Sequence, residues 1–473
     1  MNHPCYLPLK TVSVILFLII ALPGYSQLNV ELHDQYNQYK EGSITTRRFK
    51  HEDIMDVIDR LGKDFKVKQV GTSVEWRAIK LVTYGSGPVN VLMWSQMHGD
   101  ETTATRSIMD VFNWLEADDE FNDVRSKIKS AITWHFMPML NPDGASQFTR
   151  RNHYGIDINR DAIHQQTPEG RTLKRVRDSL NADWGFNLHD QGRGTSVEGV
   201  KPATISLLAP AYDVKKSINE KRGDAMQLTK LMFDQITQYL PGQIGIYDDT
   251  FEPRAFGDNI QKWGTRTILI ESGGYQDDWE KEYIRKLNFV LLITAAHSIS
   301  TKSFEKTSVA DYQNIPRNGQ GRIRELIITN VQYEGLMRDV ALDRREVDSE
   351  DYRNYYTKGY ITDLGDLQTS NAYVTLDASG YEVLPGKVYD QLLESMKELA
   401  VLDTDKLFNE GYTDFMVKSG YDPFTSKNPF NIHKDVTLKN AEMRMGGNPS
   451  LLFLRNNKIE YILVNGLLHT IKK

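Results

Sequence analysis

The chain has 473 residues, of which 40% are hydrophobic and 25% are charged, as expected of a soluble globular protein with a sizeable core. Acidic residues (63) outnumber basic ones (57), so the net charge of −6 argues against nucleic acid as a partner. The length exceeds that of one ordinary compact domain, so we expect at least two.

The N-terminus has the pattern of a secretory signal peptide covering residues 1–26. Lys10 precedes an apolar run from Val12 to Leu22, and the small residues Gly24 and Ser26 follow. The run is too short to cross a bilayer, although an uncleaved membrane anchor is the alternative. We therefore expect a periplasmic or extracellular protein without membrane association after cleavage. The only cysteine, Cys5, lies in this segment, so the mature chain would contain neither disulfides nor thiolate ligands.

Strands and helices alternate from residue 78 to about residue 300, after a polar lead-in with one predicted helix at 51–62. This alternation predicts an α/β fold, with a mixed, mostly parallel sheet flanked by helices, over residues 27–300. The expected strands are 78–84, 89–95, 132–137, 185–188 and 265–270, and the expected helices are 101–116, 169–183, 214–239 and 279–298.

The pattern lapses in residues 301–321, where Pro316, Gly319 and Gly321 among polar residues predict a linker. Residues 322–473 then read as a smaller β-rich accessory domain. Its expected strands are 322–329, 372–376, 451–454 and 459–464, interrupted by a helical stretch from Val388 to Phe415.

A pair of potential metal ligands, His98 and Glu101, follows the predicted strand 89–95. The apolar positions of the next helix form one buried stripe, and Glu101 extends that stripe at its start. A carboxylate that points inward needs a compensating charge, which a metal ion would supply. The alternative is that Glu101 only favours the positive end of the helix dipole.

Further polar side chains follow other predicted strands. Arg150, Arg151, Asn159 and Arg160 come after strand 132–137, whereas His189 and Glu271 stand at the ends of two later strands. In open α/β sheets, ligands bind outside the carboxyl ends of the strands. We therefore expect these residues to line one crevice, in which the arginines are suited to bind a carboxylate.

Five sequence blocks, in this order, resemble the zinc carboxypeptidases of the M14 peptidase type. They are HGDE at 98–101, NPDG at 141–144, R-N-x-x-G-x-D-x-N-R at 151–160, NLHD at 187–190 and IESGG at 270–274. The resemblance spans roughly residues 70–300. It implies one Zn²⁺ per chain, a peptide substrate with a free C-terminal carboxylate, and hydrolysis of the C-terminal peptide bond by zinc-bound water.

The resemblance also assigns roles to individual residues. His98, Glu101 and His189 would bind zinc, and Glu271 would be the general base. Arg151 would stabilise the oxyanion, with Arg150 as the alternative, whereas Asn159 and Arg160 would bind the terminal carboxylate of the substrate. Tyr247, 24 residues before Glu271, and Arg254 are further candidates for contact with the substrate, although the match around them is poor.

Two other functions stay open at this point. The same scaffold suits a zinc amide hydrolase that acts on murein peptides or N-acyl amino acids. A non-catalytic binding protein is the other alternative, but such a protein would be expected to have lost a ligand or the base, and here both are present.

The C-terminal region has a second, local resemblance. Residues 361–386 and 449–466 resemble the composite β-sandwich that flanks the barrel in the amidohydrolase superfamily. The residues between them are far too few for that barrel, so we interpret the region as a non-catalytic accessory domain. An unrelated small α+β domain is the alternative.

Overall fold

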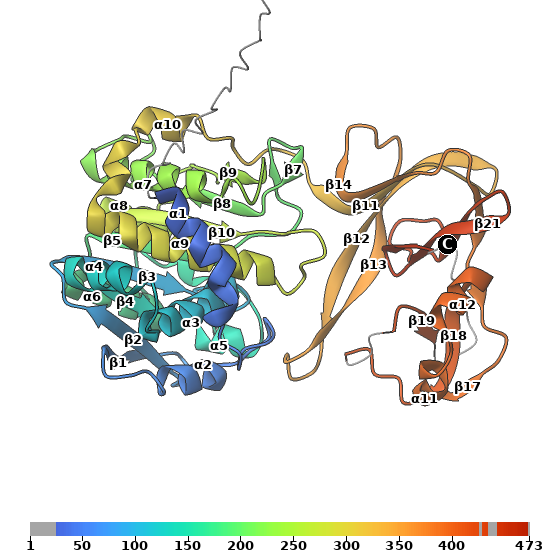
Figure 1. The fold of residues 1–473 in the computed structure, drawn as a ribbon, viewed down its shortest axis with the longest axis horizontal. Helices are drawn as coiled ribbons and strands as arrows, with labels where there is room; N and C mark the ends of the chain where they lie inside the picture. The colour runs from blue at the N-terminus through green and yellow to red at the C-terminus, as the bar shows by residue number, and fades with distance from the viewer. Residues whose placement is uncertain (1–24, 425–427, 434–441, 472–473) are drawn as a thin grey trace, which may run out of the picture.

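The computed structural model describes residues 25–424, 428–433 and 442–471, and these form two parts joined near residue 322 (Figure 1). The predicted signal peptide lies almost entirely outside the described residues. Among the residues that are described, none of the helices has the length and apolar character needed to cross a membrane.

The N-terminal part is built on an eight-stranded sheet with the strand order β1-β2-β4-β3-β5-β10-β8-β9. The four neighbours β4, β3, β5 and β10 are parallel, whereas β1, β2 and β8 form antiparallel pairs, so the predicted mixed sheet is confirmed. The strands are β1 (Phe65–Thr72), β2 (Ala78–Gly85), β3 (Val89–Ser95), β4 (Ile132–Met137), β5 (Trp184–Asp190), β8 (Ile205–Leu208), β9 (Ile244–Ile246) and β10 (Arg266–Ser272). A separate small hairpin consists of β6 (Ser196–Val197) and β7 (Lys201–Pro202).

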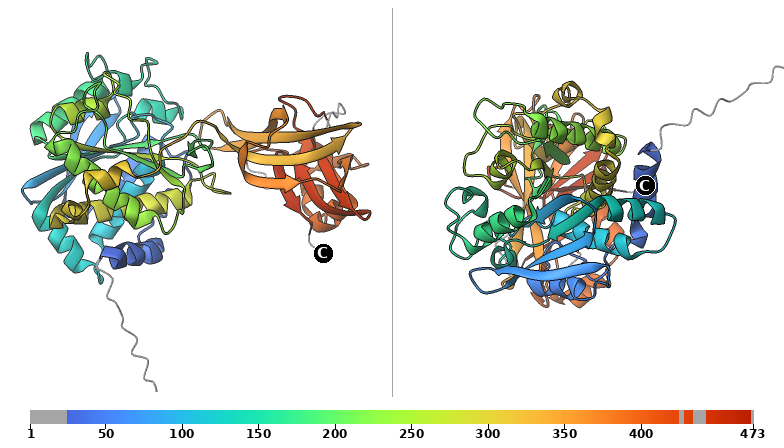
Figure 2. Two further views of the ribbon diagram at one scale, coloured as in Figure 1. Left: turned by 90° about the horizontal axis from the view of Figure 1, so that it is seen from above. Right: turned by 90° about the vertical axis from the view of Figure 1, so that its left-hand side faces the viewer.

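Helices cover both faces of this sheet (Figures 1 and 2). The larger core includes side chains of α3, α7 and α9 on one face, and a smaller core includes side chains of α6 and α8 on the other. Because both faces are covered, the central strand β5 is buried along nearly its whole length. The helices are α1 (Tyr25–Gln35), α2 (His51–Ile58), α3 (Thr103–Glu116), α4 (Asn122–Ala131), α5 (Pro142–Ser146), α6 (Pro168–Leu180), α7 (Glu220–Ile236), α8 (Phe256–Lys262), α9 (Glu282–Thr301) and α10 (Val309–Gln313).

The stretch 301–321 is more ordered than a linker. It contains a 3-10 turn (Ser303–Lys306) and α10, and both pack on the N-terminal part. The ring of Phe304 lies 5.1 Å from that of Trp184, and the Tyr312 hydroxyl accepts a hydrogen bond from the Ala209 amide (3.2 Å). These buried aromatic contacts anchor the stretch to the sheet.

The C-terminal part is β-rich, as predicted, and its described residues form three four-stranded sheets. The expected helical stretch from Val388 to Phe415 is correct only for the two short helices α11 and α12. Residues 393–395 form strand β17 before them, and Gly411, with a φ of 87°, ends α12 so that the chain continues as strand β18. Its elements are β11 (Ile323–Tyr333), β12 (Leu336–Asp348), β13 (Tyr355–Gly365), β14 (Asn371–Asp377), β15 (Glu382–Pro385), β16 (Lys387–Val388), β17 (Leu393–Ser395), α11 (Met396–Ala400), α12 (Thr404–Glu410), β18 (Tyr412–Ser419), β19 (Asn431–His433), β20 (Leu451–Arg455), β21 (Lys458–Val464) and β22 (Leu467–Thr470).

The long strands β12 and β13 reach back from the C-terminal part to the N-terminal one (Figure 1). Arg48, which is 2% exposed, pairs with Asp348 (2.7 Å), and its guanidinium carbon lies 3.5 Å from the centre of the Phe148 ring. Arg47 and Arg48 both pair with Glu346. A buried charge is costly unless it is paired, so these ion pairs favour one arrangement of the two parts.

Candidate metal centre and active site

Three neighbouring parallel strands bring the candidate residues together. His98 and Glu101 lie in the turn between β3 and α3, His189 is the penultimate residue of β5, and Glu271 is the penultimate residue of β10. Glu271 pairs in register with His189, so both side chains leave the sheet at the same level. The structure therefore brings these four predicted site residues to one edge of the sheet.

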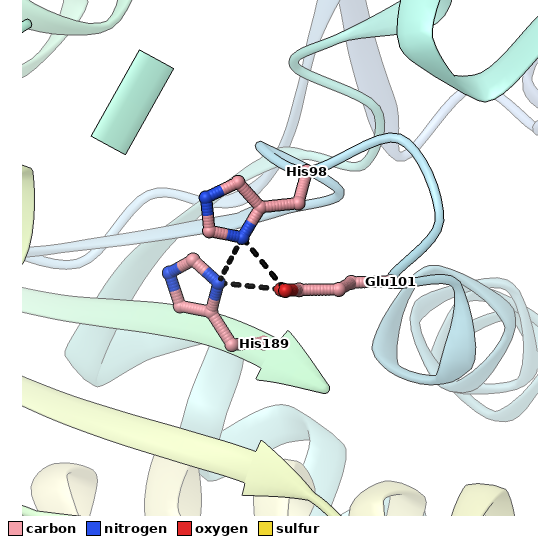
Figure 3. A group of neighbouring side chains, drawn as sticks. All are labelled: His98, Glu101 and His189. Carbon is pink, nitrogen blue, oxygen red and sulfur yellow. Dashed lines mark hydrogen bonds and ion pairs between the residues drawn. The ribbon is translucent and has the colours of Figure 1, made fainter. Parts of the chain in front are cut away.

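His98, Glu101 and His189 form a compact and buried group of potential metal ligands (Figure 3). Their ligand atoms all lie within 4.8 Å of one another. Nδ1 of His98 is 2.7 Å from Glu101 Oε1, Nδ1 of His189 is 2.6 Å from Glu101 Oε2, and the two Nδ1 atoms are 3.2 Å apart. Two imidazole nitrogens and a carboxylate that converge in this way fit a zinc ion.

Asp157 fixes the orientation of His98. Its Oδ1 lies 3.0 Å from Nε2 of His98, which leaves Nδ1 directed toward Glu101 and His189. A carboxylate on the outer nitrogen of a histidine is the usual support of a metal ligand, because it sets the tautomer and makes the other nitrogen a better donor. Asp157 is the aspartate of the block at 151–160, but the sequence alone gave no role to it.

The charges around the ligands favour a bound cation. Burial lowers the pKa of an imidazole, but the carboxylates of Glu101 and Asp157 outweigh it and raise the pKa of His98 to about 9. Burial likewise raises the pKa of a carboxyl group, but the two imidazoles outweigh it and lower the pKa of Glu101 below its usual range. Glu101 is therefore an ionised carboxylate in a buried place, where a bound cation would compensate its charge.

The first two sequence blocks, HGDE and NPDG, are in direct contact through their glycines. A β-carbon on Gly99, inside HGDE, would lie 2.0 Å from the carbonyl carbon of Gly144, inside NPDG. The side chain of Asn141 caps the same turn by accepting a hydrogen bond from the Gly144 amide (2.9 Å). The turn that carries His98 and Glu101 thus rests directly on the NPDG turn, and a larger residue at Gly99 would displace it.

Glu271 is buried beside this group. Burial, together with the nearby carboxylates of Glu101 and Asp190, raises its pKa well above the usual value for a glutamate. A carboxylate that is poorly solvated binds a proton more readily, which suits a group that accepts and returns protons.

The structure separates the two neighbouring arginines that the sequence could not distinguish. Arg150 lines the cavity: its Nη1 lies 3.1 Å from Nδ1 of His98, and its Nε donates to Asp157 Oδ2 (3.0 Å). Arg151 is exposed, and its Nη1 donates to the carbonyl of Gly155 (3.0 Å). The guanidinium beside the ligands is therefore that of Arg150, because the turn after α5 directs Arg151 away from them.

A cavity of about 1050 Å³ opens onto the ligands. Asn159, Arg160 and Tyr247 line it together with Arg150 and Glu271. The carboxylate of Glu271 and burial raise the pKa of Tyr247 to about 12, so its hydroxyl stays protonated at neutral pH. Arg254 does not belong to the lining; it pairs instead with Glu252 (3.2 Å), which does.

Other residues at this edge were not foreseen from the sequence. Asp190 donates its backbone amide to Glu101 Oε2 (3.2 Å), and its carboxylate pairs with the buried Lys281 (3.1 Å). Residues 317–320, within the expected linker, also line the cavity. The alternation of strands and helices carries no signal for these residues, because they are brought in by segments distant in sequence.

The fold and the site define an α/β protein with a buried His–Glu–His metal site at the carboxyl ends of parallel strands. The sequence model of the zinc carboxypeptidase family matches residues 52–196, so the resemblance to that family is confirmed for the segment that contains all three candidate ligands.

Two curated proteins are similar to part of the chain. An uncharacterized protein of Zymomonas mobilis is 23% identical over 176 residues, which cover 32% of this chain and 44% of that protein. Carboxypeptidase SOL1 of Arabidopsis thaliana is 26% identical over 119 residues, covering 24% of each. The chain thus spans less than half the length of these curated relatives.

Two solved structures are also similar. A metallo-carboxypeptidase from Burkholderia cenocepacia superposes with a TM-score of 0.44 at 17% identity, covering 54% of this chain and 69% of that one. A metallo-carboxypeptidase from Pseudomonas aeruginosa gives a TM-score of 0.42 at 14% identity, covering 54% and 70%.

Proposed function

We propose that the protein is an exported zinc metallocarboxypeptidase that removes C-terminal residues from peptides. The observation that carries the proposal is the convergence of His98 Nδ1, His189 Nδ1 and the Glu101 carboxylate beside buried Glu271 in a single cavity. Export is proposed from the pattern of residues 1–26 alone, with Lys10 ahead of a short apolar run.

The three ligands are the number that catalytic zinc sites use, since these sites keep one position open. A bound zinc ion supplies a Lewis acid that polarises a carbonyl group and makes water acidic enough to react near neutral pH. Glu271 takes the proton from the attacking water and returns it to the nitrogen of the leaving residue. Its pKa, which burial and the carboxylates of Glu101 and Asp190 raise, supports the first transfer, because a poorly solvated carboxylate accepts a proton more readily.

Arg150 stabilises the negative charge that develops on the carbonyl oxygen. Its guanidinium is held by Asp157, which in turn holds His98, so the arginine and the first ligand are positioned by one carboxylate. A donor that is fixed in advance stabilises such charge more than a mobile one does. We therefore propose Arg150, the alternative in the sequence analysis, rather than Arg151 as the residue that stabilises the oxyanion.

Exchanging each arginine for alanine separately tests this choice. We expect Arg150→Ala to lower kcat by about 100-fold or more, since that is the usual cost of removing one oxyanion donor. Arg151→Ala serves as the matched control, because its exposed side chain donates to the Gly155 carbonyl rather than to the ligand group, and its kcat should stay close to that of the parent. Steady-state kinetics on one peptide distinguish the two, and the reverse ranking would return the role to Arg151.

Asn159 and Arg160 bind the terminal carboxylate of the substrate, and Tyr247 donates its protonated hydroxyl to the bound peptide. All three line the cavity. Arg160 lies 3.3 Å from Glu252, and Asn159 accepts a hydrogen bond from the Phe256 amide (2.9 Å), so loop 252–256 holds both carboxylate-binding residues in place.

A comparison of peptides with free and amidated C-termini tests the proposed function. We expect the amidated peptide to show a kcat/KM lower by roughly 10- to 150-fold, because a hydrogen bond to a charged group is worth about 1.5–3 kcal/mol. Rates of release of the last residue, measured by mass spectrometry, provide the comparison. Equal cleavage of both forms would instead favour a zinc amide hydrolase that acts on murein peptides or N-acyl amino acids.

A further inference from the structure

We propose that the C-terminal part of the chain holds one wall of the substrate cavity in place and thereby contributes to peptide binding. This inference rests on the proposed function above. The wall consists of two segments: the cavity loop, residues 191–195, and the connecting segment, residues 316–321. No candidate ligand or base belongs to either segment. The connecting segment leads directly into strand β11, and the cavity loop is bound to β11 through Arg193.

The cavity loop begins two residues after His189. Gln191, Gly192 and Thr195 line the cavity, whereas Arg193 between them binds the C-terminal part. Its Nε and Nη2 donate to the two carboxylate oxygens of Glu325 on β11 (2.9 and 3.3 Å). These side chains are only 14% and 16% exposed, so the pair is shielded from water and stronger than a surface ion pair.

Aromatic rings enclose the same arginine. The guanidinium carbon of Arg193 lies 4.4 Å from the centre of the Trp279 ring and 5.0 Å from that of Tyr373 on β14. The Tyr373 hydroxyl also donates to the carbonyl of Arg193 (2.8 Å). A planar guanidinium between rings and opposite a carboxylate has little freedom, and the backbone of the loop is fixed with it.

The cavity loop also packs against the turn that follows Glu271, the proposed base. A β-carbon on Gly274, three residues after Glu271, would lie 2.3 Å from the Tyr373 hydroxyl and 2.8 Å from Cα of Arg193. The glycine thus allows the loop, the end of β10 and the C-terminal sheet to meet at van der Waals distance. Displacement of β14 would therefore reach the loop directly.

The connecting segment extends the catalytic sheet at its β9 edge. The Asn318 amide donates to the Ile246 carbonyl (2.9 Å), and the Ile246 amide donates to the Pro316 carbonyl (2.7 Å). The Asn318 side chain donates to Gln191 Oε1 (3.2 Å) and accepts from the Ser206 hydroxyl (2.9 Å). The two segments are thereby joined to each other, and residues of both face the cavity.

The wall lies outside the group of reacting residues, so its loss should weaken binding more than chemistry. We infer that the C-terminal part fixes the wall that the peptide contacts. Small displacements of a positioning element far from the chemistry lower catalytic efficiency by up to about 100-fold.

The test uses the full chain with two mild variants, Glu325→Gln and Tyr373→Phe. Each removes one contact to Arg193 without changing the shape of the side chain. We expect both to raise KM for a peptide with a free C-terminus about 3- to 30-fold with kcat nearly unchanged. The reason is that a displaced wall weakens the binding of the substrate and of the transition state to the same extent. Arg353→Gln is the matched control: it removes an inter-part ion pair with Asp53 (3.1 Å) that does not touch the wall, and its KM should equal that of the parent.

Hydrogen–deuterium exchange supplies a readout that does not depend on activity. Backbone amides of residues 191–199 should exchange faster in both variants, and not in Arg353→Gln. If the parent cleaves no peptide, the proposed function fails, but faster exchange would still support the anchored wall. Unchanged exchange and unchanged KM in both variants would overturn the inference.

Discussion

Replacing Glu271 by glutamine is expected to lower kcat by about 100- to 10,000-fold, the range over which a positioned general base accelerates proton transfer. Glutamine keeps the size of the side chain and fills the same buried place beside His189, but it cannot accept the proton of water. Because Glu271 is not among the three converging ligand atoms, zinc content should stay at that of the parent. Peptide kinetics and metal analysis of the same preparation measure both quantities.

Asp248→Asn is the matched control for this result. Asp248 also lines the cavity, but within the described part of the chain its carboxylate accepts hydrogen bonds only from Thr250, so neutralising it should leave kcat close to that of the parent. Full activity of Glu271→Gln would refute the proposal that Glu271 is the general base. Loss of zinc together with activity would show that Glu271 acts on the metal rather than on the proton.

The centre of the fold is predictable because its strands are buried on both faces. The apolar run Val89–Ser95 and the strand Ile132–Met137 have the bounds that the sequence predicts, and the parallel pairing of β3, β5 and β10 follows from the helices between them. Since ligands gather at the carboxyl ends of such strands, the positions of His98, His189 and Glu271 at one edge could also be expected.

The contacts of the site could not be derived in the same way. Arg150 and Arg151 are adjacent and chemically identical, and only the conformation of the turn decides which of them reaches His98. The contact of Asp157 with His98 could not be predicted either, because a carboxylate in a loop follows no periodic pattern that indicates its partner. A motif thus limits the candidates for a role to a few neighbouring residues, and the tertiary structure decides which of them reaches the site.

The stretch 301–321 shows a second limit of reading a sequence. Its polar residues, Pro316 and two glycines are typical of a linker, yet Asn318 pairs with β9 and lines the cavity. Edge strands are short and partly exposed, so they lack the apolar pattern of β3 or β5. The strands β8 and β9 were not predicted for a different reason: both are buried, and β8 lies between β10 and β9, but four and three residues are too few to show a periodic pattern.

Replacing His189 by alanine is expected to abolish stable zinc binding and, with it, activity. The substitution leaves His98 and Glu101 as the only two ligands. Changes to groups that merely support a ligand already cost about 10- to 100-fold in metal affinity, so the loss of a ligand itself should exceed that range. Zinc content after dialysis measures this directly. His164→Ala, which changes an exposed histidine, is the matched control and should keep its zinc.

Thermal unfolding adds an independent measure, because a ligand that binds only the folded state stabilises it by mass action. Zinc at a free concentration of 100 times its Kd should stabilise the parent by about 2.7 kcal/mol, and the same concentration should leave the melting temperature of His189→Ala unchanged. The buried Glu101 carboxylate, which lies 2.6 Å from His189 Nδ1, loses a partner in this variant, so the metal-free form should also be less stable than the metal-free parent. Retention of one zinc per chain by His189→Ala would place the metal elsewhere, and the proposed chemistry would lose its basis.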